Sequence, residues 1–211
     1  LFRSIRMEKI KPPVRALLFD MDGTLTRPTL HFGKIQREIG LPPPLLENML
    51  QLEKGERRER AFHLLEKFEN EAAHSSELNP GALAILERLE RENIPRALLT
   101  RNSRKSVDVT LSRHGIRFDA IRTRDDGPVK PDPTAIFEIC QELRVRPEES
   151  LLVGDYKYDI EAGKRAGSRT GLLTNGNPPE FLTEVSPDFI IETLLELDEI
   201  LDPKSMTMPS K

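Results

Sequence analysis

Short apolar runs alternate with longer amphipathic segments along most of this sequence. Runs of this kind predict strands at residues 14–19, 95–99, 120–121, 151–153, 170–173 and 189–191. Because they contain so few polar positions, they are typical of strands covered on both faces, as in a parallel sheet. The run at 120–121 is short, and the last run would form an edge strand.

The segments between these runs carry signals for the starts and ends of helices. Asn79 followed by Pro80 predicts an N-cap and a first helical residue. Ser103 can cap the next helix, and Gly115 is expected to end it, since glycine readily adopts the left-handed conformation found there. The regular alternation of strands and helices predicts an α/β fold with a doubly wound parallel sheet.

One segment interrupts this alternation after the first strand. Around residues 32–39, 45–52 and 61–68, apolar positions repeat at spacings of three and four, which predicts helices. An insert at this point lies over the C-terminal end of a strand, where ligands bind in open parallel sheets, so we interpret it as a small cap or lid. The predicted organisation is a core of residues 12–26 and 79–202, a helical cap of residues 27–78, and flexible termini at 1–11 and 203–211.

The composition narrows the classes of function. Charged residues make up 32% of the 211 residues, but acids and bases nearly cancel, leaving a net charge of −3. A nucleic-acid-binding protein usually has a basic patch, and no apolar run approaches the roughly 20 residues that span a bilayer. We therefore expect neither a nucleic acid nor a membrane as partner, and the sequence carries no signal for the oligomeric state. The single cysteine, Cys140, fits a core position and a reducing, cytoplasmic compartment.

Pairs of acidic residues follow two of the predicted strands. Asp20 and Asp22 come directly after the first strand, and Asp155 and Asp159 come after the fourth. An unpaired buried charge costs several kcal/mol, and a bound divalent cation would remove that penalty. Oxygen-rich sites suit Mg²⁺, and Gly23 allows a sharp turn beside the acids. The two acidic segments therefore predict one shared metal site.

Four short motifs occur in order along the chain: Asp20-Met21-Asp22-Gly23-Thr24, Thr100 after an apolar strand, Lys130 in Lys130-Pro131-Asp132-Pro133, and Gly154-Asp155 with Asp159. Together they resemble the motifs of the haloacid dehalogenase superfamily. The resemblance spans roughly residues 14–200 and is to members similar to phosphoglycolate phosphatases, here with a shortened helical cap. It implies a Rossmann-like core.

The resemblance also implies roles for the acidic residues. Asp20 would attack phosphorus and form an aspartyl-phosphate, since carboxylates are recognised covalent nucleophiles. Asp22 would act as the general acid and then as the general base. Mg²⁺ would be held by the Asp20 carboxylate, the Asp22 backbone carbonyl and Asp155, while Asp159 would help to orient that site.

Further residues would bind the phosphoryl group. By the resemblance, Thr100 donates to a phosphoryl oxygen, and Lys130 neutralises charge between that group and the nucleophile. The remaining substrate-binding candidates are Gly23, Arg101 and Asn102. Arg27 is a weaker candidate by its place in the sequence. The arginines of the predicted cap either grip an anionic substrate or form a solvated helix face; these are Arg57, Arg58 and Arg60.

Taken together, the motifs imply Mg²⁺-dependent hydrolysis of a phosphate monoester, with a small phosphorylated metabolite as substrate. Dehalogenases of the superfamily lack the second acid, so Asp22 argues against halide displacement. Two alternatives stay open: a phosphomutase, which also keeps Asp22, and a non-catalytic binding module on the same fold. A short cap favours an open site, which in turn favours hydrolysis and bulkier substrates.

Overall fold

The computed structural model describes residues 13–201, so the predictions for both termini lie outside the described residues. Within this range, a six-stranded sheet has the order β3-β2-β1-β4-β5-β6, and every neighbouring pair is parallel. The chain starts at the centre, builds one half of the sheet and then returns to build the other, which confirms the predicted doubly wound fold. The strands are β1 (Ala16–Phe19), β2 (Arg96–Leu99), β3 (Ala120–Arg122), β4 (Ser150–Gly154), β5 (Arg169–Leu173) and β6 (Phe189–Ile191).

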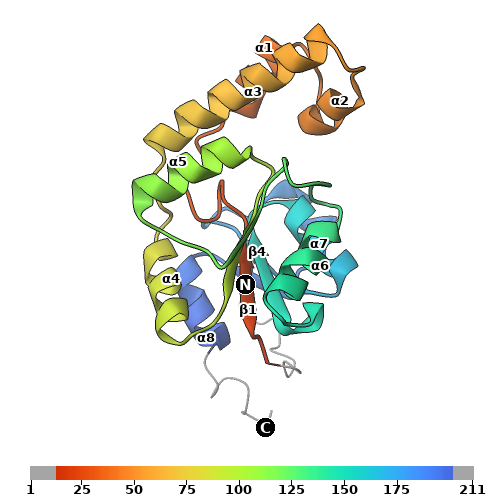
Figure 1. Ribbon diagram of the computed structural model, residues 1–211. Coiled ribbons are helices and arrows are strands. Elements are labelled where there is room, and N and C mark those ends of the chain that lie inside the picture. The colour runs from red at the N-terminus through yellow and green to blue at the C-terminus, as the bar shows by residue number, and fades with distance from the viewer. Residues whose placement is uncertain (1–12, 202–211) are drawn as a thin grey trace.

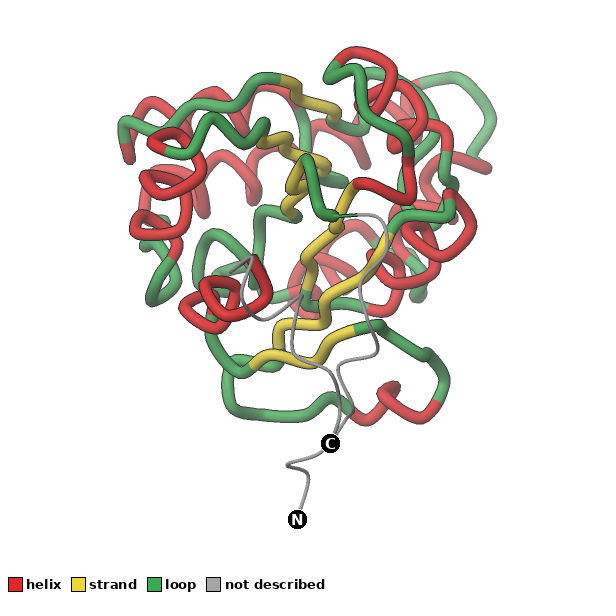
Figure 2. The backbone as a smooth tube through the Cα atoms, turned by 90° about the horizontal axis from the view of Figure 1, so that it is seen from below, coloured by secondary structure: helices red, strands yellow, loops and turns green. Residues whose placement is uncertain are grey.

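Helices cover both faces of this sheet, so the fold has three layers (Figures 1 and 2). One face is covered by α4 (Ala82–Arg91), α5 (Arg104–His114) and α8 (Leu197–Leu201). The other face is covered by α6 (Thr134–Glu142) and α7 (Lys157–Ala166). Three short 3₁₀ helices complete this part, at Pro147–Glu149, Glu180–Thr183 and Leu194–Glu196.

The central strand explains why the apolar runs lack polar positions. In β1, Leu17 and Phe19 pack in the core on the α4 side, whereas Ala16 and Leu18 pack on the α6 side. All four are 0% exposed. Successive side chains of a strand point to opposite faces, so a strand between two helical layers must be apolar at every position.

Three further helices follow β1, at one end of the molecule (Figure 1). They are α1 (Phe32–Ile39), α2 (Leu45–Gln51) and α3 (Glu56–Ser75), and they share a hydrophobic cluster that includes Ile35, Met49 and Leu65. We call residues 27–78 the insert. Its first and last residues run side by side, because the N–H of Arg27 donates to the carbonyl of Glu77 at 2.9 Å. That the insert acts as a cap stays a proposal.

The helix signals were correct at Ser103 and Gly115 but wrong at Asn79. The Ser103 side chain accepts from the N–H of Ser106, and Gly115 ends α5 in the left-handed conformation. In contrast, α4 begins at Ala82 with Gly81 as its N-cap. Asn79 serves another purpose, because its amide donates to the carbonyls of three residues in the turn after β1: Gly23, Thr24 and Thr26, at 3.0, 2.8 and 3.3 Å.

Two observations bear on the predictions from composition. Cys140 on α6 is 2% exposed and packs among apolar residues, and burial raises the pKa of its thiol. The residue is therefore an uncharged part of the core. Across residues 13–201, none of the helices combines the length and the apolar character that crossing a bilayer requires.

Candidate active site

The candidate residues gather where adjacent strands end. Asp20, Thr100 and Asp155 directly follow β1, β2 and β4, respectively. Because β1 pairs in parallel with both β2 and β4, all three residues lie at the same edge of the sheet. Lys130 reaches this edge from the segment before α6, and Asp159 reaches it from the first turn of α7.

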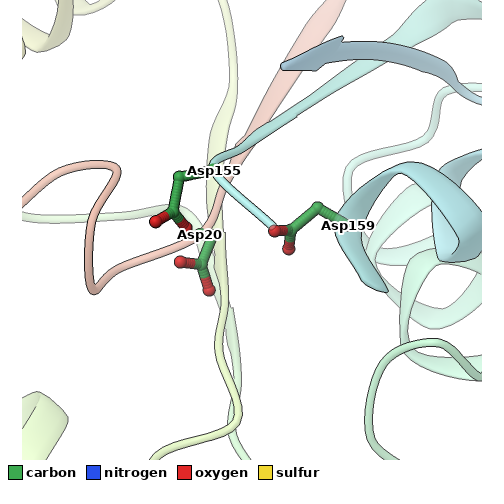
Figure 3. Close-up of side chains that lie close together, drawn as sticks. All are labelled: Asp20, Asp155 and Asp159. Atoms are coloured by element: carbon green, nitrogen blue, oxygen red, sulfur yellow. The ribbon is translucent and has the colours of Figure 1, made fainter. Parts of the chain in front are cut away.

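Three carboxylates converge at this edge. Asp20, Asp155 and Asp159 each offer one oxygen, and these oxygens all lie within 4.8 Å of one another. Figure 3 shows the carboxylates of Asp20 and Asp155 beside each other, with Asp159 directed toward them from α7. Asp20 is 8% exposed and Asp159 is 2% exposed, so this negative charge is concentrated away from bulk water.

Lys130 offsets part of that charge. Its ammonium group donates to Asp20 Oδ1 at 2.5 Å, to Asp159 Oδ1 at 2.6 Å and to the carbonyl of Leu99 at 2.8 Å. Burial alone would lower the pKa of Lys130. The Asp159 and Asp20 carboxylates raise it by more, so the pKa lies above its ordinary value. The side chain therefore stays positively charged and bridges the end of β1 to the start of α7.

The cluster has the chemistry of a divalent cation site. Burial raises the pKa of Asp155, and repulsion from Asp20 and Asp159 raises it further. Burial also raises the pKa of Asp20, against the opposing effect of Lys130. One ammonium thus leaves the carboxylates under-neutralised, and closely spaced carboxylate oxygens suit a hard ion such as Mg²⁺. Because Lys130 and the N–H of Tyr156 already bind Asp159, Asp20 and Asp155 are the more available ligands.

The side chain of Asp22 points elsewhere. Its Oδ2 accepts from the Asn102 amide at 2.6 Å, and its Oδ1 accepts from the Thr26 hydroxyl at 3.5 Å. Burial raises its pKa to about 6, although the bond from Asn102 lowers it and the charge of Glu69 adds to the increase. The Asp22 carboxylate is thus held outside the cluster of three carboxylates, and a contribution of its backbone carbonyl to an ion stays a prediction from the resemblance.

Two glycines make room for these acids. Gly23 has a φ of +82°, and a Cβ there would lie 2.0 Å from Asp155 Oδ2. At Gly154, a Cβ would lie 2.1 Å from Asp159 Cγ. The N–H of Gly23 donates to the carbonyl of Thr26 at 2.8 Å, so this group is already used in the turn. This geometry gives Gly23 a conformational role, and its contact with a substrate stays a prediction.

The residues after β2 differ in what their side chains do. The Thr100 hydroxyl accepts from the N–H of Asn102 at 3.2 Å, which lets it donate its own hydrogen elsewhere. The Arg101 side chain instead donates to Glu47 of α2 at 2.7 Å and to the Lys130 carbonyl at 3.1 Å. It also lies over the ring of Tyr158, 4.5 Å from the centroid. Arg101 is thus a contact between insert and core in this conformation, and its role in substrate binding stays a prediction.

The arginines that the sequence marked as weaker candidates lie on the surface of the molecule. Arg27 forms an exposed ion pair with Glu77 at 3.7 Å. Arg57 and Arg60 are exposed, while Arg58 donates to the carbonyls of Leu50 and Leu52 at 2.9 and 3.0 Å. Nothing in these contacts brings them to the carboxylate cluster.

Sequence reasoning missed a buried ion pair next to the site. Glu69 of α3 pairs with Arg124, and their side chains are 2% and 6% exposed. One signal could have identified Glu69, because it shares a four-residue spacing with the buried Ala61, Leu65 and Ala73. Such spacing places all four on one face of the helix. Arg124 lies in a loop, where no comparable pattern marks it.

The chain is similar to known proteins in both sequence and fold. A family model described as haloacid dehalogenase-like hydrolase matches residues 14–167. A haloacid dehalogenase-like hydrolase domain-containing protein of Arabidopsis thaliana is 29% identical over 91% of this chain and 85% of its own length. A pyrophosphatase of Halalkalibacterium halodurans is 27% identical over 91% of this chain and 99% of its own length. A phosphoglycolate phosphatase of Vibrio cholerae is 36% identical over 67% of this chain and 66% of its own length. The structure of a hydrolase from Pseudomonas syringae shares the fold, with a TM-score of 0.75 and 22% identity. The match covers 89% of this chain and 100% of that chain.

Proposed function

Because this chain belongs to the haloacid dehalogenase-like hydrolase family and is a phosphatase of that family, we propose that it hydrolyses a phosphate monoester with Mg²⁺ through a phosphorylated Asp20. The observation that carries the proposal is the convergence of Asp20, Asp155 and Asp159 around one small space, with Lys130 bound to the nucleophile. Phosphoryl transfer depends chiefly on positioning and on neutralising the charge of the transferred group, and these residues supply both.

In the first step, Asp20 attacks phosphorus. Lys130 holds Oδ1, so Oδ2 is the oxygen that forms the new bond to phosphorus, while the bond from phosphorus to the leaving oxygen breaks. The ion pair opposes the effect of burial, which raises the pKa of Asp20, and it fixes the orientation of the carboxylate. A nucleophile fixed in line with the breaking bond gains much of its reactivity from that positioning.

Asp22 supplies the proton. As the ester bond breaks, protonated Asp22 gives its proton to the leaving oxygen, and the resulting carboxylate then takes a proton from the water that attacks the phosphorylated Asp20. That attack releases inorganic phosphate and restores both acids. A general acid and base works best when its pKa lies near the working pH, and the pKa of Asp22 is about 6.

The remaining residues stabilise the charge of the transferred group. Thr100 donates its hydroxyl hydrogen to a phosphoryl oxygen, and Lys130 supplies a positive charge beside it. The carboxylates of Asp20 and Asp155 and the carbonyl of Asp22 would hold Mg²⁺, which contributes further positive charge when bound. Asp159 keeps Lys130 in place through the bond at 2.6 Å.

The substrate class is a small phosphorylated metabolite. The names of two relatives, a phosphoglycolate phosphatase and a pyrophosphatase, support this class. The charge of the site supports the requirement for Mg²⁺ in this proposal, since a phosphate dianion needs a cation in order to approach three carboxylates. A panel of phosphorylated metabolites would identify the preferred ester.

The first test is Mg²⁺-dependent release of p-nitrophenol from p-nitrophenyl phosphate. We expect turnover with Mg²⁺, none in EDTA, and almost complete loss in Asp20→Asn, because the amide is a poor nucleophile. Asp108→Asn is the matched control, since Asp108 is an exposed acid on α5. Phosphate release by well-folded Asp20→Asn at a rate close to that of the wild type would assign the nucleophile to another residue.

A further inference from the structure

A pair of opposite charges lies buried between the insert and the core. Glu69 comes from α3 and is 3% exposed, while its partner Arg124 follows β3 and has a side chain that is 6% exposed. A buried ion pair is weak evidence for stability, since removing both charges from water is costly and apolar residues can replace such pairs. Its role is therefore better sought in the groups to which the two side chains bind.

Both members of the pair bind the same short segment, residues 101–103. Glu69 Oε2 accepts from the N–H and the hydroxyl of Ser103, at 3.2 and 3.0 Å. The Arg124 guanidinium donates to the carbonyl of Arg101 at 3.3 Å, and the backbone N–H of Arg124 donates to the carbonyl of Asn102 at 3.0 Å. The ion pair thus binds the residues on both sides of Asn102, and the backbone of Arg124 binds Asn102 itself.

This segment carries the group that orients Asp22. The Asn102 amide donates to Asp22 Oδ2 at 2.6 Å, whereas the other side-chain contact of Asp22, with Thr26, is 3.5 Å long. The amide can meet Oδ2 only while the backbone of Asn102 keeps its position. The charge of Glu69 on the insert is therefore linked to the proposed general acid through two steps: first Ser103 or Arg124, and then Asn102.

We propose that Glu69 and Arg124 are positioning residues that hold Asp22, through Asn102, in line with the leaving oxygen of the substrate. This inference rests on the proposed function, in which Asp22 protonates that oxygen. It assigns α3 a part in the geometry of the reaction as well as in enclosing the site. A merely structural role, in which the pair only attaches α3 to α5, is the alternative that the experiment must exclude.

The leaving group distinguishes the two roles. Esters of acidic phenols leave as stable anions and need little help from an acid, whereas alkyl esters depend on protonation, which contributes about 10²–10⁴-fold in rate. The quantity to measure is kcat/KM, which reports phosphorylation of Asp20 and not the later hydrolysis of the phosphorylated enzyme, for a series of aryl phosphates of rising phenol pKa and for one alkyl phosphate. Displacing Asp22 should steepen the dependence of kcat/KM on leaving-group pKa, whereas general loosening should lower kcat/KM for all esters alike.

Glu69→Gln is the first variant, because it removes the charge and keeps the size. We expect kcat/KM for the alkyl ester to fall by about 10- to 100-fold, and kcat/KM for p-nitrophenyl phosphate to change by less than about threefold. Glu66→Gln is the matched control. Glu66 also lies on α3 and pairs with α5, through Lys105 at 3.0 Å, but on the exposed side, and this variant should keep the wild-type slope.

Two further variants complete the design. The double variant Glu69→Leu with Arg124→Met removes both charges. It serves if Glu69→Gln alone leaves Arg124 unpaired and unfolds the protein, and it should show the same steep dependence on leaving-group pKa. Asn102→Ala should show that slope as well, and adding Glu69→Gln to it should have little further effect, because residues acting through one contact are not additive.

Equal losses for all esters, an unchanged slope in folded Glu69→Gln, or additive effects with Asn102→Ala would each overturn the inference. Failure of the proposed function would look different. In that case the wild type would not turn over with Mg²⁺, or Asp22→Asn would leave the dependence on the leaving group unchanged.

Discussion

Replacing Asp155 by asparagine should stabilise the metal-free protein while removing its response to Mg²⁺. The carboxylate of Asp155 lies beside that of Asp20 (Figure 3), and burial together with repulsion from Asp20 and Asp159 raises its pKa from 3.8 to about 8. Asparagine keeps the shape of the side chain but carries no charge. The same change that relieves repulsion therefore removes a proposed metal ligand.

The sign and size of the effect follow from the difference in pKa. The unfolded chain loses this proton near pH 3.8 and the folded chain near pH 8, so folding becomes less favourable as the pH rises between those values. At about 1.4 kcal/mol for each tenfold change in proton affinity, the penalty reaches at most about 5 kcal/mol at pH 8. The buried amide of asparagine still needs desolvation, so we expect a net gain of about 2 kcal/mol, or about 4–8 °C in Tm for a chain of this size.

Thermal unfolding followed by circular dichroism in EDTA tests this prediction. At pH 8, Asp155→Asn should melt above the wild type. At pH 5 it should melt at or below the wild type, because only about a third of the penalty has developed while the cost of desolvating the amide is unchanged. Added Mg²⁺ should raise the Tm of the wild type and leave that of the variant unchanged. A variant that keeps its native spectrum yet melts at or below the wild type at pH 8 would refute the reasoning.

Asp188→Asn serves as the control of opposite sign. Burial favours a higher pKa for Asp188, but the bonds from Lys164 and Thr170 lower it below its ordinary value. Its charge therefore stabilises the fold above pH 4, and this contribution is lost as the pH falls through the lowered pKa. We expect Asp188→Asn to melt below the wild type at pH 8, which would show that not every loss of an acid stabilises this chain.

Two other substitutions test the turn after β1 and the contact of the insert. Gly23→Ala places a Cβ 2.0 Å from Asp155 Oδ2 at a φ of +82°, so urea unfolding should show a loss of about 2–4 kcal/mol. Gly40→Ala, at a φ of +75° with open space around it, should lose only about 1 kcal/mol, and equal losses would contradict the proposed clash. Glu47→Gln breaks the ion pair with Arg101 at 2.7 Å. Because such a pair contributes up to about 1 kcal/mol, a protease should cut within α1 and α2 up to about fivefold faster in the variant. Unchanged cleavage would show that the pair does not hold α2.

The sheet could be predicted from the sequence because burial on both faces leaves a local pattern, but the ends of its strands could not. Residues 151–153 read as a strand, whereas β4 also includes Ser150. Ser150 is 0% exposed and bonds to Ser168 and to the carbonyl of Pro147, both at 2.7 Å. A polar side chain becomes a core residue only through partners that lie elsewhere in the chain. The same reason explains the error at Asn79, whose amide bonds to a turn more than fifty residues away.

The site divides in a similar way. Its acids stand in short local motifs directly after strands, so the resemblance could identify Asp20, Asp22 and Asp155 from their order alone. The contacts that support them join residues far apart in the sequence, such as Glu69 with Arg124. Among 35 acidic and 32 basic residues, no local feature marks which charges will meet. Only the four-residue spacing of Glu69 with buried neighbours carries a signal, and it indicates burial without indicating the partner.

These contacts also change how the insert should be understood. Its third helix packs along α5, holds the buried pair, and ends where Arg113 donates to the carbonyl of Ser76 at 3.0 Å. By contrast, α2 meets the core through the pair of Glu47 and Arg101, whose side chains are 29% and 21% exposed. Because a partly exposed pair opens at lower cost than a buried one, we expect α1 and α2 to adjust to the substrate while α3 stays fixed. On this view the insert is only partly a lid, and the fixed part is the one that carries the link to Asp22.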